Sequence, residues 1–110
     1  MDKYVSFGDF KKLELKIGKI LTVEPVEGAD RLYRLEIDVG ESRPRVSVAG
    51  MAIYKAPHEL EGRLVPVITN LQPATMHGVK SEAMILAADL EGQPILLQPE
   101  IEVPPGTKIR

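Results

Sequence analysis

Hydrophobic residues alternate with polar ones over short stretches of this chain, and turn-forming residues separate the stretches. Leu13, Leu15 and Ile17 alternate with charged residues, a period of two that predicts a half-buried strand. Gly18 follows, and the apolar phase then becomes mixed, which predicts that this first strand bends and belongs to two sides of a barrel. Residues 33–39 show the clearest alternation in the chain and predict a second strand.

The next two predicted strands are shorter. Residues 45–49 predict a third strand with Val46 and Val48 facing inward, and a glycine ends it. Residues 64–68 predict a fourth, where Pro66 indicates an edge strand or a bulge because proline cannot donate to a ladder.

A helical turn is predicted at residues 56–60, with Pro57 at its first position. The continuous apolar run in 82–88 predicts a fifth strand buried on both faces, and 95–97 predicts a short sixth. Five strands with a short helical turn between the third and fourth is the order of an OB-fold barrel, here with N- and C-terminal extensions. An SH3-like barrel is the main alternative within the all-β class.

Composition limits the class of protein further. The chain has 110 residues, which predicts a single domain over 1–110. It has no cysteine, which excludes disulfides, thiolate metal sites and a cysteine nucleophile. No stretch resembles a signal peptide or a membrane helix, so a cytoplasmic protein without a membrane partner is expected. Fourteen basic and sixteen acidic residues leave a net charge of −2, without the global basic field of many nucleic-acid binders.

Catalytic chemistry is not indicated by the sequence. Histidine occurs only at positions 58 and 77, and neither His58 nor His77 has a second ligand at helical spacing. There is no glycine-rich phosphate loop or nucleotide fingerprint. We therefore expect no enzyme activity, no metal and no cofactor. The polar stretch 70–81, anchored by the apolar run 84–88, is instead the pattern of a binding loop on a small barrel.

Six segments in order resemble the tRNA-binding domain found at the C-terminus or as the β subunit of methionyl-tRNA synthetases and as free-standing tRNA-binding proteins. They read FGDFKKLELKIGKI, GADRLYRLEIDVG, RVSVAGMAIY, APHELEGR, NLQPATMHGVKSEAMILAA and EVPPGTKI. The chain also has some likeness to the secretion chaperones of the CsaA type. The resemblance implies an OB fold.

The resemblance also implies an RNA-facing surface that recognises the shape of tRNA, not DNA, and needs no catalysis. The residues it assigns to tRNA binding are Arg31, Arg45, Asn70, His77, Lys80, Ser81 and Met84. The chain departs from the family at Thr75 and His77, where a basic residue is common, and at Ala83, where glycine is usual. Each assigned residue has a plainer interpretation: the arginines as solvated charges, Asn70 and Ser81 as turn caps, and Met84 as partly core.

Relatives of this length form homodimers, and here the resemblance assigns the interface to Tyr4, Phe7, Phe10, Pro104 and Pro105. The chain would bind tRNA as a free-standing module or as a β subunit that helps the catalytic subunit of methionyl-tRNA synthetase in trans. The alternative is a homodimeric chaperone of the CsaA type that binds unfolded or presequence peptides.

Overall fold

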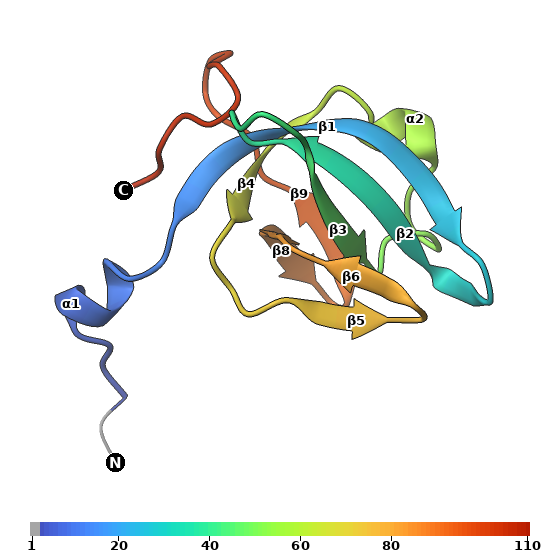
Figure 1. Ribbon diagram of the computed structural model, residues 1–110, viewed down its shortest axis with the longest axis horizontal. Helices are drawn as coiled ribbons and strands as arrows, with labels where there is room; N and C mark the ends of the chain where they lie inside the picture. Colours follow the sequence, from blue (N-terminus) through green and yellow to red (C-terminus); the bar gives the residue numbers. More distant parts are fainter. Residues whose placement is uncertain (1–2) are drawn as a thin grey trace.

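Five strands form the main sheet of the computed structural model, in the order β3-β2-β1-β4-β7, and two hairpins are attached to it (Figure 1). The structure describes residues 3–110. The elements in chain order are α1 (Phe7–Phe10), β1 (Leu15–Val26), β2 (Ala29–Asp38), β3 (Arg45–Ala49), α2 (Pro57–Leu60), β4 (Leu64–Ile68), β5 (Ala74–Met76), β6 (Val79–Ser81), β7 (Met84–Ile85), β8 (Ala87–Leu90) and β9 (Gln93–Leu96). This confirms the all-β, OB-like prediction, with a helical turn between the third and fourth strands.

Strand β1 is long and belongs to two sides of the fold. Its first part pairs with β4 and its second part with β2, with an irregularity between Ile20 and Thr22. The predicted double membership is therefore confirmed, although the bend follows Ile20 instead of Gly18. A Cβ on Gly18 would lie 2.6 Å from a methyl carbon of Ile37, so glycine is needed there because the core leaves no room for a side chain.

Both faces of β1 carry buried side chains. Gly18 and Ile20 point into the core, so Ile17 lies on the opposite face of the strand, where it is also buried. Leu13 precedes the strand and is exposed. The predicted half-buried strand is present but begins at Leu15, and Gly18 interrupts the apolar pattern on the face that enters the main core.

Strand β3 has the predicted bounds, but its faces are also reversed. Ser47, 1% exposed, pairs with Leu35 and faces the core with it. Val48 instead packs on the outer side with Val26 and Ala29, in a second apolar cluster. The expectation of Val46 and Val48 in the core is wrong because β3 buries both of its faces, and a small polar residue fits the inner one.

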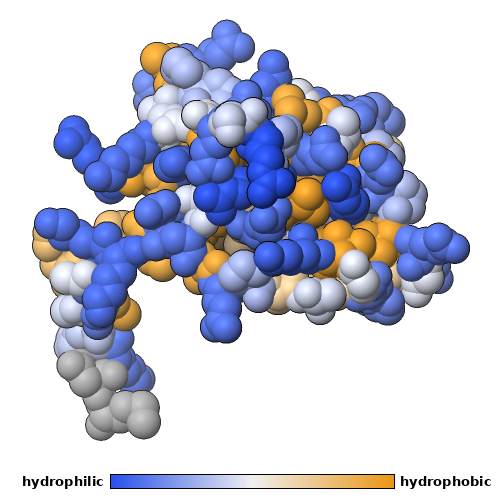
Figure 2. All heavy atoms as spheres, in the orientation of Figure 1, coloured by the Kyte–Doolittle hydropathy of each residue, from blue (hydrophilic) through white to orange (hydrophobic). Residues whose placement is uncertain are grey.

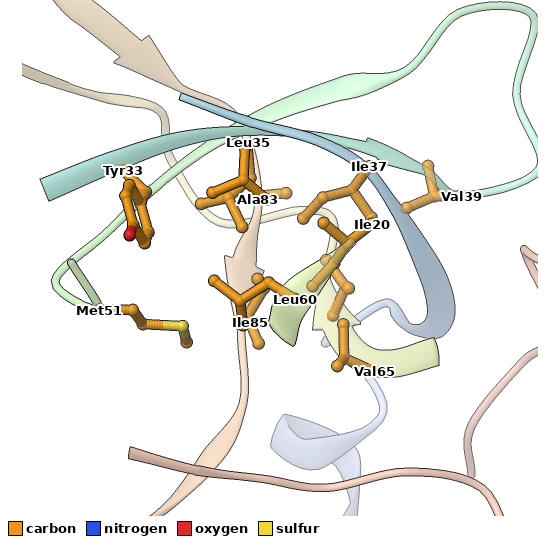
Figure 3. Close-up of a cluster of buried hydrophobic side chains, with 12 residues drawn as sticks. Ile20, Tyr33, Leu35, Ile37, Val39, Met51, Leu60, Val65, Ala83 and Ile85 are labelled. Atoms are coloured by element: carbon orange, nitrogen blue, oxygen red, sulfur yellow. The ribbon is translucent and has the colours of Figure 1, made fainter. Parts of the chain in front are cut away.

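The main core lies between β1, β2, β4 and α2 (Figure 3). Leu35, Ile37 and Ile20 come from the first two strands, and Val65 comes from β4. Leu60 of α2 is fully buried, so the helical turn places one large apolar side chain into the core. Burial of a leucine side chain contributes about 1.5–3 kcal/mol.

The predicted fifth strand, 82–88, is divided in the structure. Met84 and Ile85 form β7 beside β4, whereas Ala87 begins β8 in a separate hairpin with β9. Burial on both faces is also wrong, because Met84 and Ala88 are exposed. Strand β4 is not an edge strand. Pro66 is tolerated because pairing with β7 begins only at the next residue. Only the oxygen of Pro66 takes part in a backbone hydrogen bond there, which it accepts from the N–H of Leu86.

The C-terminal tail lies beside the start of β1. The segment before β1, which includes α1, projects away from the sheets, with apolar side chains among charged ones (Figures 1 and 2). The C-terminal tail runs antiparallel to the start of β1, and the N–H of Ile109 donates to the Leu15 oxygen at 2.8 Å. None of the helices in the described part of the chain is long and apolar enough to cross a membrane.

Candidate functional site

A groove of about 530 Å³ lies where β3 and β7 diverge. The β5–β6 hairpin and the β8–β9 hairpin contribute its other walls. The apolar side chains that line it include Met51, Leu71, Met76, Ala83, Met84 and Leu86. All three methionines within residues 3–110 line this groove. Methionine is flexible and polarizable, so a methionine-rich wall adapts to flat or irregular apolar ligands.

The β5–β6 hairpin that forms one wall is held firmly. Its turn residues, His77 and Gly78, both have positive φ, as a two-residue type I′ turn requires. Met76 and Val79 beside the turn pack against the outer apolar cluster around Val48. The hairpin is thus anchored to the outside of β3 and presents the exposed His77 side chain at its tip.

Ser81 joins the hairpin to the main sheet. Its Oγ accepts a hydrogen bond from the N–H of Val48 at 3.1 Å and donates one to the Ala83 oxygen at 3.2 Å. The N–H of Glu82 donates to the Val46 oxygen at 2.7 Å. These bonds stand in for a regular ladder between β3 and β7, and the groove lies beside them. Ser81 therefore has a structural role at the site.

Met84 follows this seam and is 49% exposed while lining the groove. The plainer interpretation of Met84 as partly core is not what the structure shows, because it is Ile85, the next residue, that enters the core. Met84 is available to a ligand in the groove.

Three predicted residues, Arg31, His77 and Lys80, lie on segments next to the groove, although none of them lines it. Lys80 is exposed on β6 next to Ser81, and His77 is at the tip of the same hairpin. Arg31 is exposed on β2, and its backbone oxygen accepts the N–H of Ala52 at 3.2 Å, which places it beside the 50–51 wall of the groove. None of these three has an ion pair among the described residues.

Arg45 is engaged within the chain. Its Nε and Nη2 donate to the two carboxylate oxygens of Glu41 at 2.8 and 2.9 Å, and Nη1 donates to the Thr69 oxygen at 2.6 Å. The hydrogen bond from Arg45 holds the pKa of Glu41 below its ordinary value, and the carboxylate in turn raises the pKa of Arg45. Nη1 also lies 3.3 Å from the Glu82 oxygen, so this guanidinium bridges β3 and the start of β7.

Asn70 is likewise engaged. Its Oδ1 accepts from the N–H of Glu14 at 2.7 Å and its Nδ2 donates to the Lys12 oxygen at 2.6 Å. This differs from a cap of its own turn, because the partners are 56 and 58 residues away. RNA contact by Arg45 and Asn70 stays a prediction that would have to compete with these internal hydrogen bonds.

The groove itself is not basic. Glu82 and Asp89 line it together with the apolar side chains. A phosphate would be repelled by these carboxylates, whereas an unpaired base or an apolar side chain would find contact area on the apolar residues. Arg31 and Lys80 on neighbouring segments suit phosphates of the same ligand. No group of three or more metal-ligating side chains occurs within residues 3–110.

Sequence reasoning found Ser81 and Met84 but missed Met51, Leu71 and Met76. The methionines themselves are the signal that could have pointed to this surface. Methionines that gather on one surface form an adaptable contact. Their convergence depends on three different loops and could not be read from spacing.

The comparisons with known proteins agree with this geometry. Residues 15–108 match the family model described as "Putative tRNA binding domain". The chain belongs to the tRNA-binding domain family. Among curated relatives, the methionine–tRNA ligase of Methanosarcina mazei is 47% identical over 107 residues, covering 96% of this chain and 15% of that enzyme. The chain therefore spans about a sixth of the length of the ligases it matches.

Two solved structures are similar over nearly the whole chain. A MetRS-related protein from Pyrococcus horikoshii has a TM-score of 0.90 at 32% identity, covering 100% of both chains. The chaperone CsaA from Bacillus anthracis has a TM-score of 0.86 at 35% identity, covering 97% of this chain and 99% of that one. The resemblance inferred from the sequence, including its likeness to both branches, is confirmed.

Proposed function

We propose that this chain binds folded tRNA without catalysing a reaction, and that it does so at the methionine-lined groove. The observation that carries the proposal is an apolar, methionine-lined groove next to segments that carry the exposed and unpaired side chains of Arg31 and Lys80. Phosphates would contact the two cations, and an unstacked base fits the groove.

The recognition would depend on shape more than on sequence. Arg31 on β2 and Lys80 on β6 are exposed near the groove and would contact phosphates of the bound RNA. Met84 and Met76 in the groove would contact the face of a base or a ribose, and neither offers a hydrogen-bond pattern that selects one base. A tRNA would be chosen because its fold presents an unpaired nucleotide between phosphates at the required spacing.

The relatives suggest how such binding is used. Methionine–tRNA ligases contain a domain of this family. We infer that the chain raises the affinity of a methionyl-tRNA synthetase for tRNA in trans, either as a free-standing module or as a β subunit beside the catalytic subunit. Binding in trans acts through effective concentration, because tRNA held by the module stays close to the catalytic subunit.

A homodimer is part of this proposal. Phe7 and Tyr4 are 74% and 89% exposed on the projecting arm, and Phe10 is exposed on it as well. Pro104 and Pro105 lie in the tail, whose end pairs with the start of β1 directly after this arm. Large apolar side chains at such exposure are a surface that a second copy would cover, and a two-fold dimer would double the RNA-binding surface.

The test is a filter-binding titration of folded tRNA at two salt concentrations, with unstructured RNA and a presequence peptide as competitors. Selective binding of folded tRNA that weakens steeply with salt is the expected result. Substitution of Lys80 by alanine should weaken tRNA binding without a change in melting temperature, because Lys80 is exposed and unpaired. Salt-insensitive binding of peptide, without affinity for tRNA, would refute the proposal.

The same groove supports a second candidate, a chaperone of the CsaA type. Its walls are mainly apolar and rich in methionine, which suits unfolded segments as well as bases. Similarity to a CsaA structure over nearly the whole chain supports this candidate. The exposed and unpaired side chains of Arg31 and Lys80 favour RNA, because a peptide gains little from them.

A further inference from the structure

The C-terminal tail is held beside β1 by two glycines that touch. Gly40 and Gly106 both have positive φ, and a Cβ on Gly106 would lie 2.8 Å from the Val39 oxygen and 2.9 Å from the Gly40 Cα. No other residue type fits this approach without a shift of the backbone. The contact sets the tail against the end of β2, in the position from which it can pair with the start of β1.

Three backbone hydrogen bonds then align the tail with β1. The N–H of Gly106 donates to the Ile17 oxygen at 2.7 Å, and the N–H of Ile17 donates to the Thr107 oxygen at 2.8 Å. The N–H of Ile109 donates to the Leu15 oxygen at 2.8 Å. This pattern brackets one pair of opposed residues, Lys16 and Lys108, whose antiparallel bridge is thereby fixed in register.

Lys16 and Lys108 occupy a non-hydrogen-bonded position of this ladder, because the bonds join the residues on either side of them. Side chains at such positions lie on the same face, and their Cα atoms are only about 4.5 Å apart. Two like charges directly opposite each other destabilise a sheet. Neither lysine has an ion pair among residues 3–110.

The surroundings offset this charge only in part. The carboxylate of Glu41 is close enough to Lys16 to attract it, but both of its oxygens already accept hydrogen bonds from the Arg45 guanidinium. Arg43 adds a further cation without an ion pair in the part of the chain that the structure describes, and it lines a small cleft with Arg45 and Glu82. Glu41, which attracts Lys16, lines this cleft, and Glu82 lines both the cleft and the methionine-lined groove, so Lys16 lies toward the end of the groove at this cleft.

We propose that Lys16 and Lys108 form a second phosphate contact for the tRNA backbone, and that placing Lys108 opposite Lys16 is the function of the C-terminal tail. The proposal rests on the tRNA binding proposed above. An oxyanion between the two ammonium groups removes their repulsion and accepts hydrogen bonds from both. The repulsion therefore lowers the stability of the unbound protein and raises its affinity for a polyanion.

The matched control is Lys19, on the same strand. It lies three residues from Lys16 and therefore on the opposite face, and it pairs across the sheet with Asp38. A lysine there carries the same charge on the same strand but is opposite an acid. Its loss should leave the salt dependence of tRNA binding unchanged.

The experiment compares wild type, the double variant Lys16→Gln/Lys108→Gln and Lys19→Gln by filter binding of tRNA over a series of salt concentrations. Two lost phosphate contacts should reduce the slope of log K against log salt by about 1.4 to 1.8. Extrapolated to a common value at 1 M salt, this is about 25- to 60-fold weaker binding at 0.1 M. The melting temperature of Lys108→Gln at low salt should equal or exceed that of wild type, because a repulsion is removed.

An unchanged slope in the double variant would overturn the inference, as would an equal loss of slope in Lys19→Gln. A melting temperature of Lys108→Gln well below wild type would also count against it, because it would assign the lysine a structural role. These outcomes require that wild type binds tRNA. If wild type does not bind tRNA, the proposed function itself fails, which the same titration shows separately.

Discussion

Arg45 should hold β3 and the segment before β7 together, so its replacement tests how the sheet is closed. In the variant Arg45→Ala, the seam between β3 and the start of β7 loses the guanidinium that contacts Glu41, Thr69 and Glu82. Except for the pair with Glu41, the lost interactions join residues far apart in the sequence. Arg45 is 24 positions from Thr69 and 37 from Glu82. We therefore expect a loss of global stability and not only of ligand affinity.

The magnitude follows from the separate contacts. The Arg45–Glu41 pair is partly exposed, with 27% and 35% of the side chains accessible, so it contributes about 0.5–1 kcal/mol after screening by solvent. The bond to the Thr69 oxygen is short and comes from a charged donor, which contributes about 1.5 kcal/mol. The long bond to Glu82 adds little. A total near 2 kcal/mol should lower the melting temperature by about 8 °C.

The assay is thermal unfolding followed by circular dichroism at pH 7, with Arg34→Ala as the matched control. Arg34 makes a similar pair with Glu36 at 3.1 Å but donates to no backbone oxygen among the described residues, so its loss should cost below about 1 kcal/mol. A melting temperature of Arg45→Ala within about 2 °C of wild type, well inside the shift worked out for 2 kcal/mol, would refute the reasoning.

Acid titration separates the ionic part of this contribution. The hydrogen bond from Arg45 depresses the pKa of Glu41 below its ordinary value of 4.5 in the folded state. A depressed carboxyl pKa stabilises the folded state above the unfolded value and loses that effect as the pH falls through the folded value. The stability difference between wild type and Arg45→Ala should therefore be constant above about pH 5.5 and shrink below pH 4.5. A difference that grows on acidification would contradict the assignment.

Three other changes test the fold around the site. Asn70→Ala removes two hydrogen bonds to the backbone of 12–14 and should cost about 1–2 kcal/mol, with faster amide exchange at Glu14; unchanged exchange would show that the bonds do not hold this segment. Gly106→Ala should lower the melting temperature more than Gly28→Ala. Both glycines have positive φ, but a Cβ on Gly28 meets nothing within 4 Å. Equal effects would mean that only backbone strain matters. Ser81→Ala should speed hydrogen exchange of the Val48 amide selectively, by about the tenfold expected from losing roughly 1 kcal/mol. Protection equal to wild type would exclude the hydrogen bond between Ser81 and Val48 as a link between β6 and β3.

Sequence reasoning was most accurate where a period-two pattern coincided with turn residues. The bounds predicted for 45–49 and 64–68 match β3 and β4, and the helical turn at 56–60 overlaps α2. It failed at 82–88, because an apolar run carries no signal for the point where a chain leaves one sheet and joins another. It also assigned the wrong face in β3, since Ser47 is an inward residue that a hydrophobic pattern does not reveal.

The candidate site was predicted only in part, for a related reason. Ser81 and Met84 line one groove, and Arg31, His77 and Lys80 lie on segments next to it. Arg45 and Asn70 carry the same chemical groups but are engaged by partners far away in the sequence. Whether a polar side chain is available to a ligand depends on what lies within about 3 Å of it, which local sequence does not determine.

The amino-acid sequence by itself determined the all-β class, the order of the strands and membership of the tRNA-binding domain family, because alternation, turn residues and motif order are local properties of the chain. The tertiary structure decided which cations are unpaired, that three methionines share one groove, and that Lys108 lies opposite Lys16. Each of these arises from contacts between residues distant in sequence, and such contacts exist only once the sheet has closed and the two glycines have brought the tail against β1.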